Sequence, residues 1–192
     1  MMTPKDVLRH YLQEARDTML WKLEDLGERD IRRPMTATGT NLLGLVKHVT
    51  GVELGYFGQV FDRPAANAPA WLDDGEDNED MWATADESRE FIVEQYRSAW
   101  AHSDSTIDAL ELDASGTVPW WRPESRAVTL QRILVHVTSE TARHAGHADI
   151  VRELIDERAG LRPGVSNLPS GDAAWWREYR ERLQKVADSF DA

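Results

Sequence analysis

Apolar side chains recur every three or four residues over most of this 192-residue chain, and no segment alternates convincingly over the length of a strand. Periodicity of this extent predicts an all-α protein whose helices bury their apolar faces against one another. We expect a helical bundle that forms a single domain over residues 1–192. The expected helices cover about residues 3–27, 41–61, 84–112 and 129–160, and an additional C-terminal helix covers about residues 172–190.

Residues that favour helix starts precede most of these segments. Thr3 is suited to cap the first helix and is followed by a proline, and Asp172 is suited to cap the last helix. The second helix is expected to begin after Thr40–Asn41, and the helix with the longest apolar stripe near Thr129. Residues 84–87 have the spacing of a capping box, which predicts the start of the third helix.

Two connections lack helical periodicity. Residues 62–83 predict a long surface connection, and their acidic run at 73–80 lacks the spacing of a calcium-binding loop, so we assign it no site. Residues 113–128 predict a loop with a short extended piece at 117–118.

Charge and cysteine content restrict the function. The chain holds 34 acidic and 22 basic residues, a formal charge of −12, which disfavours nucleic acids and anionic membranes as partners and favours a small molecule. No stretch is apolar enough to span a membrane, and the first residues lack the apolar centre of a signal peptide, so we expect a cytoplasmic protein. Because there are no cysteines, the strong metal ligands available are histidine and carboxylate, and a catalytic thiol must come from outside.

The histidines are grouped. His136, His144 and His147 share the fourth expected helix with Glu140. At about 100° per residue, His144 lies only about 20–40° from the centre of the apolar stripe and points inward. Glu140 and His147 each lie one turn from His144, but about 10 Å of axis separates them, so they cannot easily share one ion.

His48 lies at the margin of the apolar stripe of the second helix, next to a face of four glycines. The glycines lower helix propensity and predict that another element or a ligand comes close to that face. If the second and fourth helices pair, His48 can meet Glu140 and His144 to form a site for zinc, nickel or iron with open positions for water and substrate. The alternative is a polar seam satisfied by neighbouring side chains. The four glycines are Gly44, Gly51, Gly55 and Gly58.

The chain has eight tryptophans, including two adjacent pairs. The pair Trp120–Trp121 predicts either a lid packed on the end of the bundle or an aromatic wall of a pocket. The pair Trp175–Trp176 belongs to the amphipathic last helix, whose apolar face is suited to a homodimer or partner contact.

Two motifs together resemble one family. Residues 43–53 (LGLVKHVTGVE) and 140–149 (ETARHAGHAD) are similar to the DinB/YfiT-like superfamily, closest to an actinobacterial branch and more distantly to mycothiol-dependent maleylpyruvate isomerases. The resemblance implies an up-down-down-up four-helix bundle with a divalent metal at His48, Glu140 and His144. Many members have histidine where this chain has Glu140, and His147 either supports the ligands or replaces Glu140 among them.

The resemblance also implies an activity. The better-understood members of this family use a small thiol such as mycothiol or bacillithiol as cosubstrate, so the chain is predicted to be a metal-dependent thiol transferase or isomerase, with zinc or nickel as the metal. One alternative is a hydrolase that uses metal-activated water. The other is a non-catalytic stress or binding protein in which the metal site is structural.

Overall fold

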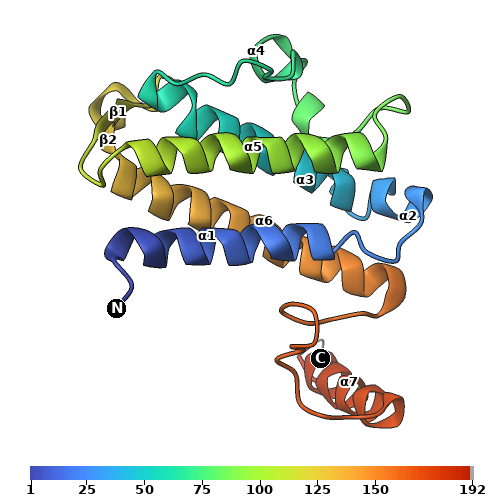
Figure 1. The fold of residues 1–192 in the computed structure, drawn as a ribbon. Coiled ribbons are helices and arrows are strands. Elements are labelled where there is room, and N and C mark those ends of the chain that lie inside the picture. Colours follow the sequence, from blue (N-terminus) through green and yellow to red (C-terminus); the bar gives the residue numbers. More distant parts are fainter. Residues whose placement is uncertain (191–192) are drawn as a thin grey trace.

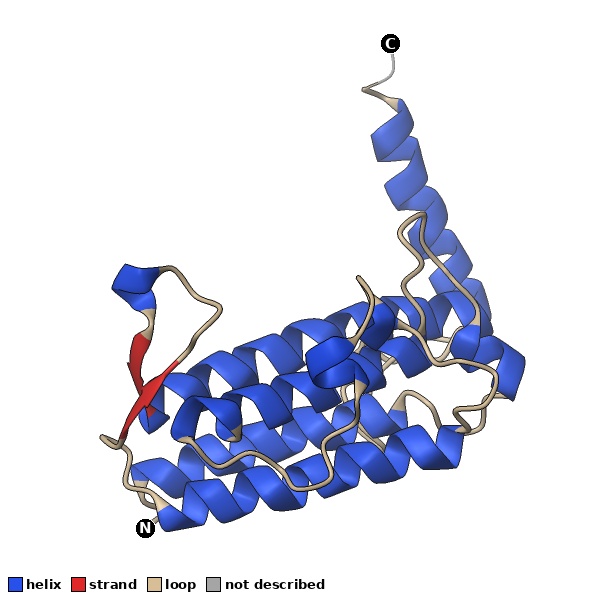
Figure 2. Ribbon diagram, turned by 90° about the horizontal axis from the view of Figure 1, so that it is seen from above, coloured by secondary structure: helices blue, strands red, loops and turns tan. Residues whose placement is uncertain are grey.

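The computed structural model describes residues 1–190, apart from the side chains at positions 73 and 74. Four long helices form an all-α bundle (Figures 1 and 2): α1 (Pro4–Trp21), α3 (Leu42–Phe57), α5 (Arg89–Ala109) and α6 (Leu130–Asp156). α1 and α6 run in one direction and α3 and α5 in the other, which is the expected up-down-down-up order. α3 packs against both α5 and α6, and α1 packs against α6.

Short elements fill the connections. The two strands pair antiparallel at one end of the bundle, so the loop expected at 113–128 contains a small hairpin. The short elements are α2 (Glu28–Arg32), η1 (Gln59–Phe61), α4 (Trp71–Asp74), η2 (Glu79–Met81), β1 (Ser115–Thr117), η3 (Pro123–Ser125) and β2 (Ala127–Thr129).

The predicted caps at Thr3 and Asp172 are confirmed, and two helix boundaries are corrected. The side chains of Thr3, Asn41, Thr129 and Asp172 each accept a hydrogen bond from a backbone N–H of the first helical turn. The first helix, however, ends at Trp21 instead of near residue 27, because the chain turns over residues 22–25 before the separate helix α2 begins.

The predicted start of the third helix is also wrong. α5 is capped by Ser88, whose hydroxyl accepts from the N–H of Phe91. The Thr84 N–H does donate to the Glu87 carboxylate at 2.8 Å, but Glu87 also pairs with Lys47 of α3 at 3.0 Å. The contact therefore ties a turn to the bundle ahead of α5 instead of opening the helix.

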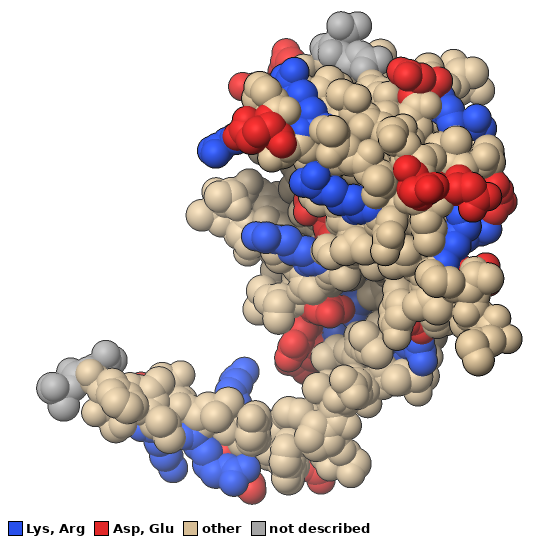
Figure 3. Space-filling model, turned by 90° about the vertical axis from the view of Figure 1, so that its left-hand side faces the viewer, with Lys and Arg blue, Asp and Glu red and all other residues tan. Residues whose placement is uncertain are grey.

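The core runs along the inside of the four long helices, and α7 (Ala173–Asp188) lies outside it. α7 projects from the bundle (Figures 1 and 3), and none of its residues is buried. Its apolar face stays exposed at Trp175, Tyr179, Leu183 and Val186. A homodimer contact through this face stays a prediction. Within residues 1–190, no helix has both the length and the apolar character that crossing a bilayer requires.

Candidate metal centre

Helices α3 and α6 bring three of the expected side chains together. The Glu140 Oε1 atom lies 3.2 Å from Nε2 of His144, one turn along α6, and 3.9 Å from Nε2 of His48 on α3. One ligand atom from each of the three residues lies within 4.8 Å of the others. The side chains of His144, His48 and Glu140 are 12%, 22% and 34% exposed. The cluster thus sits where the α3–α6 contact opens to solvent.

Asp80 orients the imidazole of His48. Its carboxylate lies 2.6 Å from Nδ1 of His48, so Nε2 is the ring nitrogen that faces Glu140 and His144. A carboxylate on the outer nitrogen of a metal-binding histidine fixes the tautomer and increases the basicity of the inner nitrogen. The acidic run at 73–80, to which the sequence analysis assigns no site, thus contributes Asp80 as a hydrogen-bond partner of the candidate cluster.

A glycine on α3 allows the segment that carries Asp80 to lie close to this helix. A Cβ at Gly44 would lie 1.8 Å from the carbonyl oxygen of Met81, so only glycine allows η2 to approach α3 this closely. The same carbonyl accepts from the Asn41 side chain at 3.1 Å, and Lys47 Nζ donates to the carbonyl of Trp82 at 3.1 Å. These contacts fix both sides of the segment that carries Asp80. No pattern in the sequence distinguishes this aspartate from its acidic neighbours.

The electrostatics keep the cluster ready to bind a cation. Burial lowers the pKa of His144, and the neighbouring His48 lowers it further, although Glu140 opposes the shift. The imidazole of His144 is therefore neutral near pH 7, as a metal ligand must be. The hydrogen bond with His48 lowers the pKa of Asp80, so this carboxylate stays ionised.

The other histidines lie outside the cluster. His147 is exposed, and its ring centroid lies 5.3 Å from that of His144; the group of possible ligands includes Glu140 and not His147. His136 packs against Tyr56 with ring centroids 4.7 Å apart, and its pKa is lowered mainly by burial. His10, on the outside of α1, has a side chain that is 55% exposed.

The donor set suits a divalent cation. Ligand atoms about 2.1 Å from a tetrahedral metal lie ~3.4 Å apart, and the separations of 3.2 and 3.9 Å are close to that value. Nδ1 of His144 is buried without a hydrogen-bond partner among the described residues. Nε2 is therefore the ring nitrogen of His144 that is available to bind a metal. Two imidazoles and one carboxylate match zinc, nickel and iron and do not distinguish among them.

A cavity of about 470 Å³ adjoins the cluster, which forms one of its sides through His48 and Glu140. The predicted close approach to the glycine face is confirmed, because a Cβ at Gly51 would lie 3.1 Å from the indole of Trp71 and one at Gly55 would lie 3.4 Å from that of Trp120.

The two predictions for the Trp120–Trp121 pair are both confirmed, one for each residue. Trp120 lines the cavity as an aromatic wall, whereas Trp121 packs against the buried cluster at the hairpin end of the bundle. Both indole N–H groups donate to the hydroxyl of Tyr56, at 3.3 Å from Trp120 and 3.0 Å from Trp121.

Comparisons with known proteins agree with this architecture. The family model described as mycothiol-S-transferase matches residues 7–157. A crystal structure of the conserved protein of a locus from Enterococcus faecalis matches with a TM-score of 0.60 and 15% sequence identity, covering 82% of this chain and 100% of that one. At that identity the likeness concerns the fold alone. No curated protein sequence matches the chain.

Proposed function

The chain belongs to the mycothiol S-transferase family, and on this premise we propose that it is a divalent-metal-dependent enzyme that transfers a small thiol of the mycothiol type to an electrophilic small molecule. His48, Glu140 and His144 are the proposed ligands. The observation that carries the proposal is the convergence of their donor atoms within 4.8 Å at the edge of a cavity.

The absence of cysteine supports a thiol that arrives as cosubstrate, because the chain itself supplies no sulfur nucleophile. When bound at the cluster, a divalent cation supplies the positive charge that favours thiolate over thiol at neutral pH. In the transfer, the thiolate sulfur forms a bond to the electrophilic carbon, and the electron pair of the bond that breaks leaves with the displaced group.

The protein residues position the reactants. Asp80 holds His48 with its Nε2 toward the cluster, which keeps the ligand atoms in one arrangement before a cosubstrate arrives. The cavity holds the electrophile beside His48 and Glu140, and the indoles of Trp71 and Trp120 exclude water from its walls. His147, exposed next to His144, is proposed as a supporting residue and not as a ligand.

The test combines elemental analysis with a conjugation assay. Protein purified without added metal is expected to hold about one equivalent of a divalent cation and to conjugate mycothiol to monochlorobimane, which fluoresces when a thiol displaces its chloride. His144→Ala is expected to lose both properties, whereas His10→Ala, a matched substitution outside the cluster, keeps them. Less than a tenth of an equivalent in the wild-type protein, with no increase on reconstitution, would contradict the proposal.

A further inference from the structure

The walls of the cavity beside the cluster have an unusual composition. Three aromatic side chains, Tyr56, Trp71 and Trp120, line it together with three carboxylates, Glu76, Asp80 and Glu140, and none of its described lining residues is lysine or arginine. Aromatic faces combined with carboxylates are the usual surroundings of an organic cation.

The indoles next to this cavity already face cations of the chain itself. Lys47 Nζ lies 5.2 Å from the ring centroid of Trp71, and the Arg132 guanidinium lies 4.9 Å from that of Trp121. Trp120 is 48% exposed as a residue, and no such cation among the described residues lies over its ring. Its indole N–H is held by Tyr56, so the ring is a fixed wall with a face available to a ligand.

The charges favour the same ligand. The Asp80 carboxylate is hydrogen-bonded to His48, and Glu140 belongs to the proposed ligand set. Glu76, in contrast, is exposed, and no side chain of the described residues pairs with its carboxylate. The three carboxylates and a bound thiolate would together carry four negative charges, whereas a divalent cation supplies two positive charges. An anionic second substrate would therefore be repelled, and a cationic one attracted.

We propose that this cavity selects a second substrate that carries a positively charged group, such as a quaternary ammonium or a protonated amine, with that group against the indole of Trp120 and Glu76 as its counter-charge. That this ligand is a substrate rests on the proposed function. The preference for a cation is a property of the cavity itself and can be measured without any thiol.

The test uses two probes of the same shape. Choline and 3,3-dimethyl-1-butanol differ only in a positively charged nitrogen against a neutral carbon, and both carry the same hydroxyl group. Titrating each into the metal-loaded protein, with tryptophan fluorescence as the readout, is expected to give a dissociation constant about tenfold lower for choline. Similar constants for the two probes would overturn the proposal.

Two variants and a control locate the effect. Glu76→Gln and Trp120→Leu are each expected to reduce the preference for choline at least about threefold. Glu178→Gln, the same change on the exposed helix α7, is expected to leave the preference unchanged. An unchanged preference in both Glu76→Gln and Trp120→Leu would contradict the assignment to this cavity.

The outcomes separate this inference from the proposed function. A preference for choline in protein that holds no metal and conjugates no thiol would support the cation cavity and contradict the transferase. Thiol conjugation with equal affinity for the two probes would support the transferase and contradict the cation cavity.

Discussion

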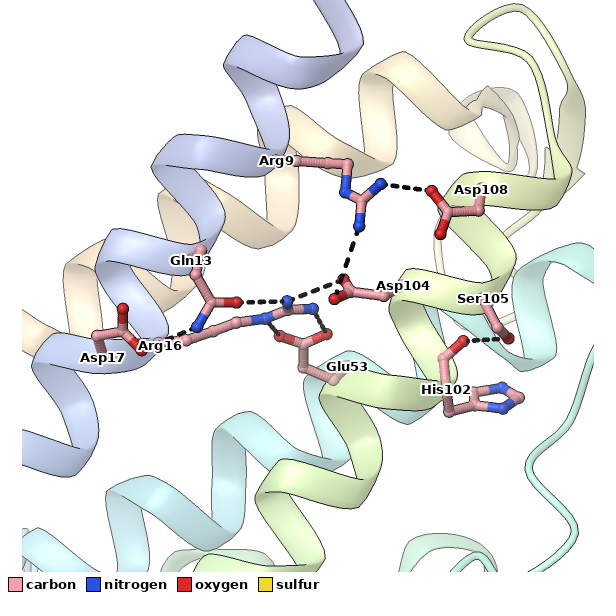
Figure 4. Close-up of polar contacts among 9 residues, drawn as sticks. All are labelled: Arg9, Gln13, Arg16, Asp17, Glu53, His102, Asp104, Ser105 and Asp108. Carbon is pink, nitrogen blue, oxygen red and sulfur yellow. Dashed lines mark hydrogen bonds and ion pairs between the residues drawn. The ribbon is translucent and has the colours of Figure 1, made fainter.

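Helix α3 carries two polar clusters, and they differ in how far their hydrogen-bonding groups are satisfied. Glu53 receives two hydrogen bonds from Arg16, at 2.6 and 2.8 Å, and both side chains are almost wholly buried (Figure 4). Arg16 also donates to Gln13 and Asp104. His48, five residues earlier and about 140° around the helix, belongs instead to the half-open cluster beside the cavity.

The difference indicates which cluster is structural. Burial lowers the pKa of Arg16, but the neighbouring Glu53 and Asp104 carboxylates together outweigh burial and raise this pKa above its ordinary value, so the guanidinium stays charged. The charges of this cluster are matched inside the protein, although Arg16 also lines a second cavity of about 310 Å³ together with Gln13 and Asp104. In the other cluster, two imidazole nitrogens and a carboxylate oxygen converge, and no lysine or arginine among the described residues forms an ion pair with them. Polar groups that remain available next to a cavity are those expected to bind a ligand.

The largest expected effect is on folding. Glu53→Gln leaves the Arg16 charge buried without its main partner and should lower the free energy of unfolding by about 3–5 kcal/mol, measured by urea denaturation of the metal-free protein. The double variant Arg16→Met with Glu53→Leu should recover much of this loss, because it removes both charges together. A loss below about 1 kcal/mol in Glu53→Gln would show that the two clusters do not differ in this way.

The same experiment on the open cluster should give the opposite pattern. His144→Ala should weaken metal binding by at least about 100-fold, because a proposed ligand is lost, yet change the stability of the metal-free protein by only about 1 kcal/mol. Metal titration and urea denaturation measure the two effects. A variant that unfolds without metal would identify this cluster as structural as well.

Gly44→Ala tests how Asp80 reaches His48. The added methyl group would collide with the Met81 carbonyl, so η2 must move away from α3. We expect about 10–100-fold weaker metal binding together with about 1–3 kcal/mol of lost stability. Gly146→Ala is a matched control, since a Cβ there meets no atom within 4 Å. If Gly44→Ala binds metal as the wild-type protein does, η2 does not control the position of Asp80.

Asp80→Asn separates orientation from packing. The amide has nearly the same shape, so stability should change by less than about 0.5 kcal/mol, whereas metal affinity should fall about 10–100-fold because His48 loses its charged partner. Isothermal titration with the metal measures the affinity. Wild-type affinity in this variant would mean that the hydrogen bond between Asp80 and His48 has no part in binding.

The smallest effect is expected at His147. Since this exposed side chain lies outside the convergent group, His147→Ala should change metal affinity less than about threefold. A loss as large as that in His144→Ala would instead make His147 a ligand.

Most of the fold could be predicted from the periodicity of the apolar residues and from the residues that cap the helices. The stripes of α3 and α6 predicted both helices, and the inward direction of His144 followed from its angle to the stripe of α6. The end of the first helix was missed, because a turn at residues 22–25 with a positive φ at Asp25 leaves little trace in an amphipathic pattern.

The candidate site could be predicted only in part. The pairing of Glu140 with His144 is local, so spacing indicated it, whereas Asp80 and the wall residues Trp71 and Glu76 come from a connection without periodicity. Their contacts depend on how that connection folds back across α3, which is a tertiary property that a local pattern does not encode.

The most direct test of the central claim is anomalous diffraction at the zinc and nickel absorption edges from crystals of the protein purified without chelators. We expect one anomalous peak at about 2.0–2.2 Å from Nε2 of His48, Nε2 of His144 and a carboxylate oxygen of Glu140. The account would be contradicted by a cluster that shows no peak after reconstitution with either metal, or by a bound metal that His48 does not contact.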